Sequence, residues 1–420
     1  MEFNALTRQK NIYTDGFAGR RPALPVDFPQ LESAAKSKLS SQAYAYIAGG
    51  AGLESTQAAN RSVWDKYPIV PRMLRDVSQR QMAVNFLGAA YPLPMFLCPI
   101  GVLELAHPGA DLAVAAACKN LGIPMMVSNQ ASHAMEDIAQ VLNGSPWFFQ
   151  LYVSKSDELV VHFIRRAEQA GARGIVITLD TTMLGWRPRD LNLGSLPFLE
   201  GRGIAQYTSD AVFKKLMKGL VKDQSKKRIN VQSIRNLIQL ASRLPGPFIR
   251  NLKGDALDAV RLFTQIYSRP DLNWDTISRI KSSTKLPIIL KGIQHPQDAL
   301  NALELGVDAI YVSNHGGRQV DGAVGSLDAL VGIKEVVRNK IPLLFDSGVR
   351  CGADITKALA LGATMTGIGR PYTYALALDG ARGVETLIQH LAAELELNMA
   401  LSGTKSVLEL EGILQNPGLH

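Results

Sequence analysis

The chain has 420 residues, a formal net charge of +8, 46% apolar and 20% charged residues, and three cysteines. This is the composition of a globular protein with a large core, and it excludes disordered, fibrous and disulfide-rich chains. The longest apolar runs are shorter than the roughly 20 residues of a membrane span, and the first residues lack the apolar stretch of a signal peptide, so we expect a cytoplasmic protein without a metal cluster.

The first 90 residues predict an N-terminal extension with one helix, from Leu31 to Gly49. Beyond it, one unit recurs: a helical pattern ends at a glycine, and a short apolar strand follows. The glycines take the position where a helix end needs the left-handed conformation; they are Gly122, Gly171, Gly306 and Gly362. The strands are apolar at consecutive positions, which is typical of a parallel sheet covered on both faces. They are expected at 94–99, 124–128, 147–152, 174–180, 287–291, 308–313, 341–346 and 364–369.

Eight alternating units without a second sheet predict an α/β fold, a single (β/α)8 TIM barrel. We therefore divide one domain, residues 1–420, into four parts: an extension (1–90), the barrel (91–185 and 271–380), a lid insertion after the fourth strand (186–270), and a C-terminal helix and tail (381–420). The lid contains a basic cluster between Lys214 and Lys253. Such a cluster is usually a solvated face, and less often a surface for nucleic acid or membrane headgroups.

Polar residues at the ends of the predicted strands are the candidates for chemistry, because TIM-barrel active sites lie there. In SNHGGRQ, His315 can exchange a proton and Arg318 can bind a carboxylate. Asp180 follows the fourth strand and would stabilise a protonated imidazole beside it, and Arg187 is a second carboxylate clamp. Lys291 ends the fifth strand, where it could form a Schiff base or balance an anionic cofactor.

Two glycine-rich segments, DSGVRCGAD and GIGRPY, follow the seventh and eighth strands. TIM barrels commonly bind phosphate at these loops, through backbone amides and added positive charge. Arg350 and Arg370 supply that charge here. The segments predict a phosphorylated cofactor or substrate. A Rossmann nucleotide site is not supported, because the sequence has no GxGxxG motif after a first strand.

With YIAGGAG, FFQLY, ITLDT, GWRPRD and LKGI, these motifs resemble those of the FMN-dependent L-2-hydroxy-acid oxidising family, from about Tyr44 to Glu409. The resemblance implies catalytic roles for His315, Asp180, Lys291 and Tyr152. It implies a substrate site of Tyr46, Tyr152, Arg187, His315 and Arg318. It implies an FMN site of Pro99, Ile100, Gly101, Ser128, Gln150, Thr178, Lys291, Ser313, Asp346, Gly348, Arg350, Gly369 and Arg370.

Within this family, PRML, LPFLEG, YTSDAVF and LKGIQHP, together with Gly101, are most similar to lactate 2-monooxygenases. The resemblance implies oxidation of a small L-2-hydroxy acid, in the first place L-lactate, with oxygen as acceptor, and a homotetramer or larger assembly. Leu151, Met183, Leu184 and residues of the lid are expected in the pocket wall.

Two alternatives stay open at this point. One is a 2-hydroxy-acid dehydrogenase or oxidase that uses another acceptor or releases hydrogen peroxide. The other is a non-catalytic barrel that binds nucleic acid or a membrane surface through its basic lid; we expect neither partner, because no nucleic-acid motif and no apolar stripe accompanies the charge.

Overall fold

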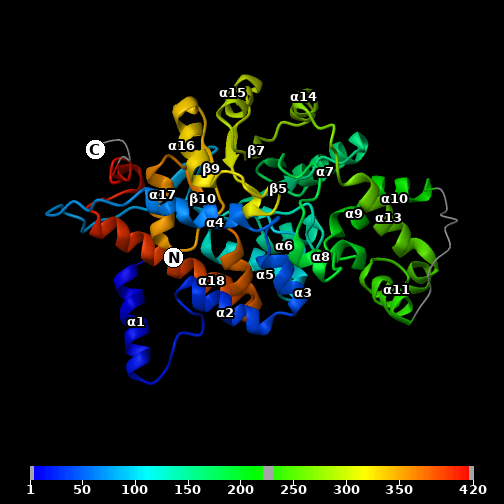
Figure 1. The fold of residues 1–420 in the computed structure, drawn as a ribbon, viewed down its shortest axis with the longest axis horizontal. Coiled ribbons are helices and arrows are strands. Elements are labelled where there is room, and N and C mark those ends of the chain that lie inside the picture. Colours follow the sequence, from blue (N-terminus) through cyan, green and yellow to red (C-terminus); the bar gives the residue numbers. More distant parts are fainter. Residues whose placement is uncertain (1–3, 221–230, 416–420) are drawn as a thin grey trace.

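The computed structural model describes residues 4–220 and 231–415, and its centre is a closed barrel of eight parallel strands (Figure 1). The neighbours run in the order β10-β3-β4-β5-β6-β7-β8-β9. The bounds are β3 (Met95–Leu97), β4 (Met125–Val127), β5 (Trp147–Leu151), β6 (Ile175–Thr178), β7 (Ile288–Ile293), β8 (Ala309–Val312), β9 (Leu343–Phe345) and β10 (Met365–Ile368). The predicted TIM barrel is confirmed, because each strand begins and ends close to its expected range.

Helices separate the strands and cover the outside of the barrel. They are α5 (Ala110–Leu121), α6 (Met135–Leu142), α7 (Asp157–Gln169), α14 (Trp274–Ser282), α15 (Pro296–Leu305), α16 (Ser326–Val337), α17 (Gly352–Ala360) and α18 (Arg370–Leu401). The glycines expected after four of them all have positive φ, from +68° at Gly122 to +104° at Gly362. Glycine therefore allows the chain to leave each helix and enter the next strand without steric strain.

One end of the barrel is closed by a hairpin of β1 (Val84–Phe86) and β2 (Ala89–Tyr91). The expectation of no second sheet was wrong. The ring of Phe86 lies 5.7 Å from that of Phe148, at the start of β5, and both side chains are buried. The hairpin thus seals the N-terminal end of the barrel with aromatic packing and leaves the opposite end for ligands.

The single helix expected from Leu31 to Gly49 is two helices, α2 (Phe28–Lys38) and α3 (Ser41–Ala48), so this prediction was wrong. Leu39 is extended, and the Ser40 hydroxyl accepts a hydrogen bond from the amide of Ala43. Ser40 thus acts as an N-cap, which favours a new helix start over continuation. The break turns the end of α3 towards the C-terminal mouth of the barrel.

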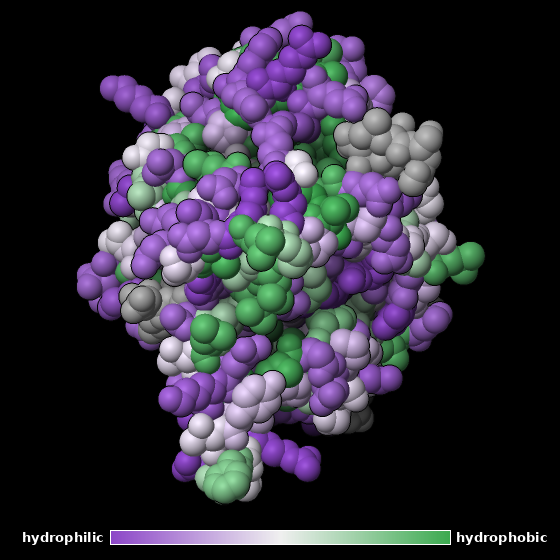
Figure 2. Space-filling view, turned by 90° about the vertical axis from the view of Figure 1, so that its left-hand side faces the viewer, coloured by the Kyte–Doolittle hydropathy of each residue, from purple (hydrophilic) through white to green (hydrophobic). Residues whose placement is uncertain are grey.

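The C-terminal helix expected from about residue 381 is the second part of α18, which begins at Arg370 and is interrupted by non-helical backbone at Asp379 and Gly380. The N-terminal helix α1 (Ala5–Phe17) contacts α18 through Arg8, which donates a hydrogen bond to His390. Figure 1 shows the rest of α1 extending away from the barrel. Figure 2 views the molecule from this side: most of the face is hydrophilic, with an apolar patch near its centre.

The lid insertion folds into short helices beside the barrel mouth: α8 (Pro188–Asn192), α9 (Ala205–Ser209), α10 (Ala211–Lys218), α11 (Val231–Arg243), α12 (Phe248–Arg250) and α13 (Ala256–Ile266). The remaining helix, α4 (Ser55–Ser62), follows α3. Part of the basic cluster, between Lys222 and Arg228, lies outside the described residues. In the described ranges, no helix combines the length and the apolar character that a membrane crossing requires.

Candidate active site

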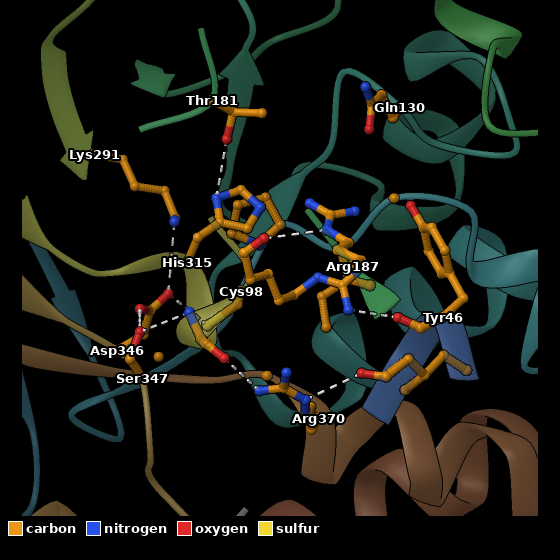
Figure 3. Close-up of a pocket in the computed structure, with 18 of the residues that line it drawn as sticks. Tyr46, Cys98, Gln130, Thr181, Arg187, Lys291, His315, Asp346, Ser347 and Arg370 are labelled. Carbon is orange, nitrogen blue, oxygen red and sulfur yellow. Dashed lines mark hydrogen bonds and ion pairs between the residues drawn. The ribbon is translucent and has the colours of Figure 1, made fainter. Parts of the chain in front are cut away.

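A cavity of about 1050 Å³, its open mouth included, lies at the C-terminal ends of the strands. Its walls come from the end of α3, the loops after the barrel strands, and the lid (Figure 3). Most predicted site residues line it: Tyr46, Pro99, Ile100, Gly101, Tyr152, Arg187, Lys291, His315, Arg318, Asp346, Gly348, Arg350, Gly369 and Arg370. Segments spread over more than 300 positions of the chain therefore meet at one concave surface, as expected for the active end of a TIM barrel.

His315 and Asp180 form a direct pair. Nδ1 of His315 lies 2.8 Å from Oδ1 of Asp180, and the hydroxyl of Thr181 lies 3.3 Å from the same nitrogen. His315 has a positive φ of +57°, and its backbone amide donates to the hydroxyl of Ser313. If Nδ1 carries the proton that Asp180 accepts, the lone pair of Nε2 is free to accept a proton from a ligand.

The electrostatics of this pair suit a proton acceptor. Burial alone would raise the pKa of Asp180, but the charges of His315 and Lys291 overcome burial and lower that pKa to about 2. Burial lowers the pKa of His315, and Asp180 opposes this shift without cancelling it. At neutral pH we therefore expect an ionised Asp180 beside a neutral His315, whose protonated form the carboxylate would stabilise.

Arg187 and Arg318 bring two guanidinium groups to the same wall, and their bonds go to neutral groups. Arg318 donates to the carbonyls of Tyr46 and Gly49, and Arg187 donates to the carbonyl of Arg318 and to the amide oxygen of Gln319. Burial, followed by the charge of Arg187, lowers the pKa of Arg318 to about 9. Asp190 opposes this lowering of the pKa without cancelling it, and a bound carboxylate would oppose it further.

Arg350 and Arg370 form a second cationic corner of the cavity. Arg370 donates to the carbonyls of Ile47, Gly49 and Gly316, while Arg350 lies over the ring of Phe28, 4.3 Å from its centroid. Burial lowers the pKa of each arginine to about 10.

Within the described residues, the ion pairs include neither of these two arginines, nor Arg187 or Arg318. Arg350 and Arg370 give this corner of the cavity two positive charges, and α18 begins beside them, so the corner suits a phosphate.

Lys291 is buried at 4% exposure and reaches the floor of the cavity. Its ammonium donates to the hydroxyl of Ser313 at 2.9 Å and lies 3.9 Å from Oδ2 of Asp346. Burial opposes the charge, yet the carboxylates of Asp346 and Asp180 keep the pKa of Lys291 above its ordinary value. A permanently charged ammonium at this position can stabilise negative charge on a ligand ring.

Three predicted cofactor residues lie beneath the cavity rather than in its wall. Ser128, Gln150 and Thr178 are buried and joined in a chain, since the Gln150 amide donates to Thr178 at 2.9 Å and accepts from Ser128 at 3.3 Å. Ser313 is likewise outside the wall and bonds Lys291. These four residues support the ring of wall residues from below.

Two expectations for the pocket wall were wrong. Met183 is 63% exposed and Leu151 is fully buried in the core, so only Leu184 of that group lines the cavity. Phe198 and Tyr267 line the cavity, as expected of the lid but without being predicted individually, whereas Gln130 lines it and was not predicted at all. Gln130 follows a strand by a few residues, which was a weak signal; the two aromatic residues belong to the lid, whose packing no local pattern predicts.

The donor set fits FMN. The cationic corner of Arg350 and Arg370 suits its phosphate, and the ammonium of Lys291 stands where an electron-rich ring needs positive charge. Near the mouth, the uncompensated pair of Arg187 and Arg318 leaves a separate place for a carboxylate. These features define a flavin enzyme for an anionic substrate.

Comparison with known proteins gives the family. The family model described as FMN-dependent dehydrogenase matches residues 35–416. An L-lactate oxidase of Lysinibacillus sphaericus is 39% identical over 399 residues, covering 94% of each chain. A 4-hydroxymandelate oxidase of Amycolatopsis orientalis is 34% identical, covering 91% of this chain and 96% of its own. The crystal structure of a mandelate oxidase with (S)-4-hydroxymandelic acid superposes with a TM-score of 0.77 at 32% identity, covering 93% of this chain and 98% of that one.

The chain belongs to the FMN-dependent dehydrogenase family. It is therefore an FMN-dependent oxidoreductase that acts on 2-hydroxy acids, and the expected cofactor and enzyme class are confirmed. This assignment replaces the alternative of a non-catalytic barrel.

Proposed function

We propose that the protein oxidises L-lactate at its α-carbon with molecular oxygen as the electron acceptor. The observation that carries this proposal is the pairing of a buried His315–Asp180 dyad with two guanidinium groups that form no ion pair within residues 4–220 and 231–415. A 2-hydroxy carboxylate offers an anion for the two arginines and an α-carbon for the imidazole. Similarity to an L-lactate oxidase supports lactate as the substrate.

In this proposal, Arg187 and Arg318 hold the substrate carboxylate, with Tyr46 beside Arg318, whose guanidinium carbon lies 5.0 Å from the centroid of the tyrosine ring. The Nε2 atom of His315 accepts the proton that leaves the substrate, and Asp180 stabilises the resulting imidazolium. Tyr152 orients the substrate hydroxyl; burial raises the pKa of this phenol, so it stays a neutral donor.

Arg350, Arg370 and the loops at Gly348 and Gly369 would hold the phosphate of FMN, while Asp346 would contact its ribityl chain. Pro99, Ile100, Gly101 and Lys291 would border the ring, above the Ser128–Gln150–Thr178 chain. When bound, FMN supplies a two-electron acceptor. Lys291 would hold its positive charge beside that acceptor, an electrostatic contribution of roughly a few kcal/mol.

For the products, we propose acetate, carbon dioxide and water, as in lactate 2-monooxygenases. The stoichiometry balances: lactic acid and O2 give acetic acid, CO2 and H2O. Phe198 and Tyr267 from the lid, and Leu184 just before it, line the cavity and support this outcome, because a covered site retains pyruvate and hydrogen peroxide long enough to react.

A second candidate outcome is release of pyruvate and hydrogen peroxide, and the packing of Gly101 favours it. A Cβ at this position would lie 2.9 Å from Cβ of Gln130 and 3.1 Å from its carbonyl oxygen. Gln130 thus explains the glycine without any role for free space above a ring. Gly101, one of the features that suggested a monooxygenase, thus has a packing reason to be glycine.

The test is oxygen uptake by the purified yellow protein with L-lactate, with acetate and hydrogen peroxide measured in the same samples. Acetate equal to the oxygen consumed supports the monooxygenase outcome, and stoichiometric peroxide supports the oxidase. Parallel assays with D-lactate and (S)-mandelate test the substrate. Fast dye reduction with little oxygen uptake would contradict oxygen as the acceptor, and preference for mandelate would contradict lactate.

A further inference from the structure

A second cavity lies on the other side of Asp180 from the active site. It is bounded by the loops after β6, β7 and β8 and by the starts of α14 and α15, and it encloses about 1150 Å³ with its mouth included. The residues that carry the argument are Asp180, Gln294 and Asp298, which are polar, and Trp274, Ile277 and Ile293, which are apolar. None of these residues except Asp180 has a part in the proposed reaction.

Two buried acceptor atoms of this lining have no hydrogen-bond partner in the described part of the chain: Oδ2 of Asp180 and Oε1 of Gln294. The side chain of Asp180 is only 6% exposed, and its other oxygen bonds His315 and Thr181. An unsatisfied buried acceptor, especially a charged one, costs more than it contributes unless a donor reaches it. Both atoms belong to residues that line the second cavity, so a donor bound there is a candidate partner for each.

The backbone brings the end of β7, just before Gln294, close to Asp180. Gly292 has a φ of +101°, and the pairing of β7 with β8 shifts register between Lys291 and Ile293. A Cβ on Gly292 would lie 2.9 Å from Cβ and Cγ of Asp180. Only glycine permits β7 to pass this close, so the irregularity directs Lys291 to the active site and Gln294 to the second cavity.

The chemistry of the lining selects the donor. Its ionisable groups are the carboxylates of Asp180 and Asp298; the described residues that line the cavity include no lysine, arginine or histidine. Trp274, Ile277 and Ile293 supply apolar surface, with the side chains of Ile277 and Ile293 almost fully buried. Negative charge beside an indole suits an ammonium group, and the apolar wall suits a small hydrocarbon body.

We propose that this cavity binds a small primary amine in its protonated form. The ammonium donates hydrogen bonds to Oδ2 of Asp180 and Oε1 of Gln294, and its apolar body packs against Trp274 and Ile277. A cation in this cavity also acts on the dyad: it competes with the imidazolium of His315 for the charge of Asp180, so flavin reduction slows. This coupling rests on the proposed role of His315, whereas the binding does not.

The experiment is isothermal titration calorimetry of the holoenzyme with benzylammonium, with benzyl alcohol as the neutral control of equal shape. Saturable binding of the amine, and none of the alcohol, is expected. Gln294→Leu removes one acceptor with little change of volume, and Ala323→Phe fills the cavity from its rim. Each should weaken binding by at least about tenfold, the effect of one lost hydrogen bond to a charged group, while L-lactate oxidation without amine continues.

Equal binding of amine and alcohol, or amine binding that survives both variants, would overturn the proposal. Displacement of the amine by L-lactate would also overturn it, because it would place the amine in the first cavity. Stopped-flow reduction of the flavin with and without saturating amine tests the coupling separately. Saturable binding that leaves the reduction rate unchanged supports the site and rejects the coupling to His315.

Discussion

The two ends of the barrel use the same scaffold in opposite ways. At the N-terminal end, the hairpin packs Phe86 and Tyr91 against interior side chains such as Phe148, and this surface is apolar and dry. At the C-terminal end, the hydrogen bonds of Arg318 and Arg370 go to neutral groups, and within the described residues a buried oxygen of Asp180 has no hydrogen-bond partner. The closed end gains stability from burial, whereas the open end keeps unsatisfied charge that a ligand can complete.

The comparison teaches that conformational stability and chemistry are separable along the barrel axis. Residues of the closed end should alter the free energy of unfolding without altering substrate affinity. Residues of the open end should alter rates or cofactor properties with a smaller effect on folding.

The largest expected effect is at the open end. His315→Ala should slow reduction of bound FMN by L-lactate about 1,000-fold or more, because general-base catalysis typically contributes 100- to 10,000-fold. Stopped-flow spectroscopy measures this rate, and the flavin spectrum provides the control that cofactor is still bound. Normal reduction by the variant would rule out the proposed role of this imidazole.

The next effect is at the closed end. Phe86→Ala should lower the free energy of unfolding by about 3 kcal/mol or more, because it leaves a cavity against Phe148. Phe17→Ala is the matched control, since Phe17 is 97% exposed and its loss should change stability by less than about 0.5 kcal/mol. Denaturant unfolding measures both. A changed KM for L-lactate in the Phe86 variant would break the separation of the two ends.

A smaller effect should come from Tyr311, which lies between the ends on β8. Its hydroxyl donates to Oδ2 of Asp346 at 2.6 Å, and the ammonium of Lys291 lies 5.0 Å from its ring centroid. Tyr311→Phe frees this carboxylate to turn to Lys291, which weakens the positive field of the ammonium at the cavity floor. We expect a lower midpoint potential of the bound flavin and a loss of about 2 kcal/mol in apoprotein stability.

The matched control is Tyr207→Phe, which removes a buried tyrosine hydroxyl bonded to Asn129 on the lid side. It should cost about 1 kcal/mol of stability and leave the flavin potential unchanged. A similar shift of the midpoint potential in both variants would mean that Tyr311→Phe acts through a general loss of packing rather than through its hydrogen bond to Asp346.

The smallest effect concerns acid, and it tests whether a region outside both ends responds to pH. Burial, followed by the charge of Arg8, lowers the pKa of His390 to about 4. As the pH falls, His390 is therefore protonated in the unfolded chain before it is protonated in the folded protein. The contribution of neutral His390 to the free energy of unfolding is complete above about pH 6.5 and declines towards pH 4. Between about pH 6.5 and 5.5 we expect a loss of about 1 kcal/mol.

Thermal unfolding of the wild type and of His390→Gln at several pH values measures this titration. The variant should lose the acid-sensitive part of the stability, and proteolysis within α1 should then depend less on pH. An unchanged pH profile would assign the acid sensitivity to another group.

The barrel was predictable because each strand is a short apolar run that starts soon after a helix-ending glycine, as at Gly122 and Gly306. The hairpin was not, because strands of three residues are too short to show alternation. The break at Ser40 was not predicted, although serine is a common N-cap residue. Helix propensity alone does not decide between one helix and two, because the position of α3 depends on its tertiary packing at the barrel mouth.

For the site, the positions of His315, Arg318 and Lys291 in the cavity followed from strand-end location alone. The carbonyl acceptors that hold Arg318 and Arg370 did not, because backbone groups leave no signal in the sequence. The position of Gln130 in the cavity also did not follow from the sequence, because its proximity to Gly101 depends on how two loops meet. The roles of these residues in the reaction remain predictions for the experiments above.

The carbonyls at the end of α3 have a consequence for biosynthesis. Tyr46 and Gly49 leave the ribosome early, but the guanidinium groups that they orient belong to Arg318 and Arg370, which are made much later. A nascent chain can form its first strands while these early carbonyls still face water. The arginines of the anion-binding wall are therefore synthesised only in the last quarter of translation. A prematurely terminated chain would lack them and could not bind the cofactor phosphate.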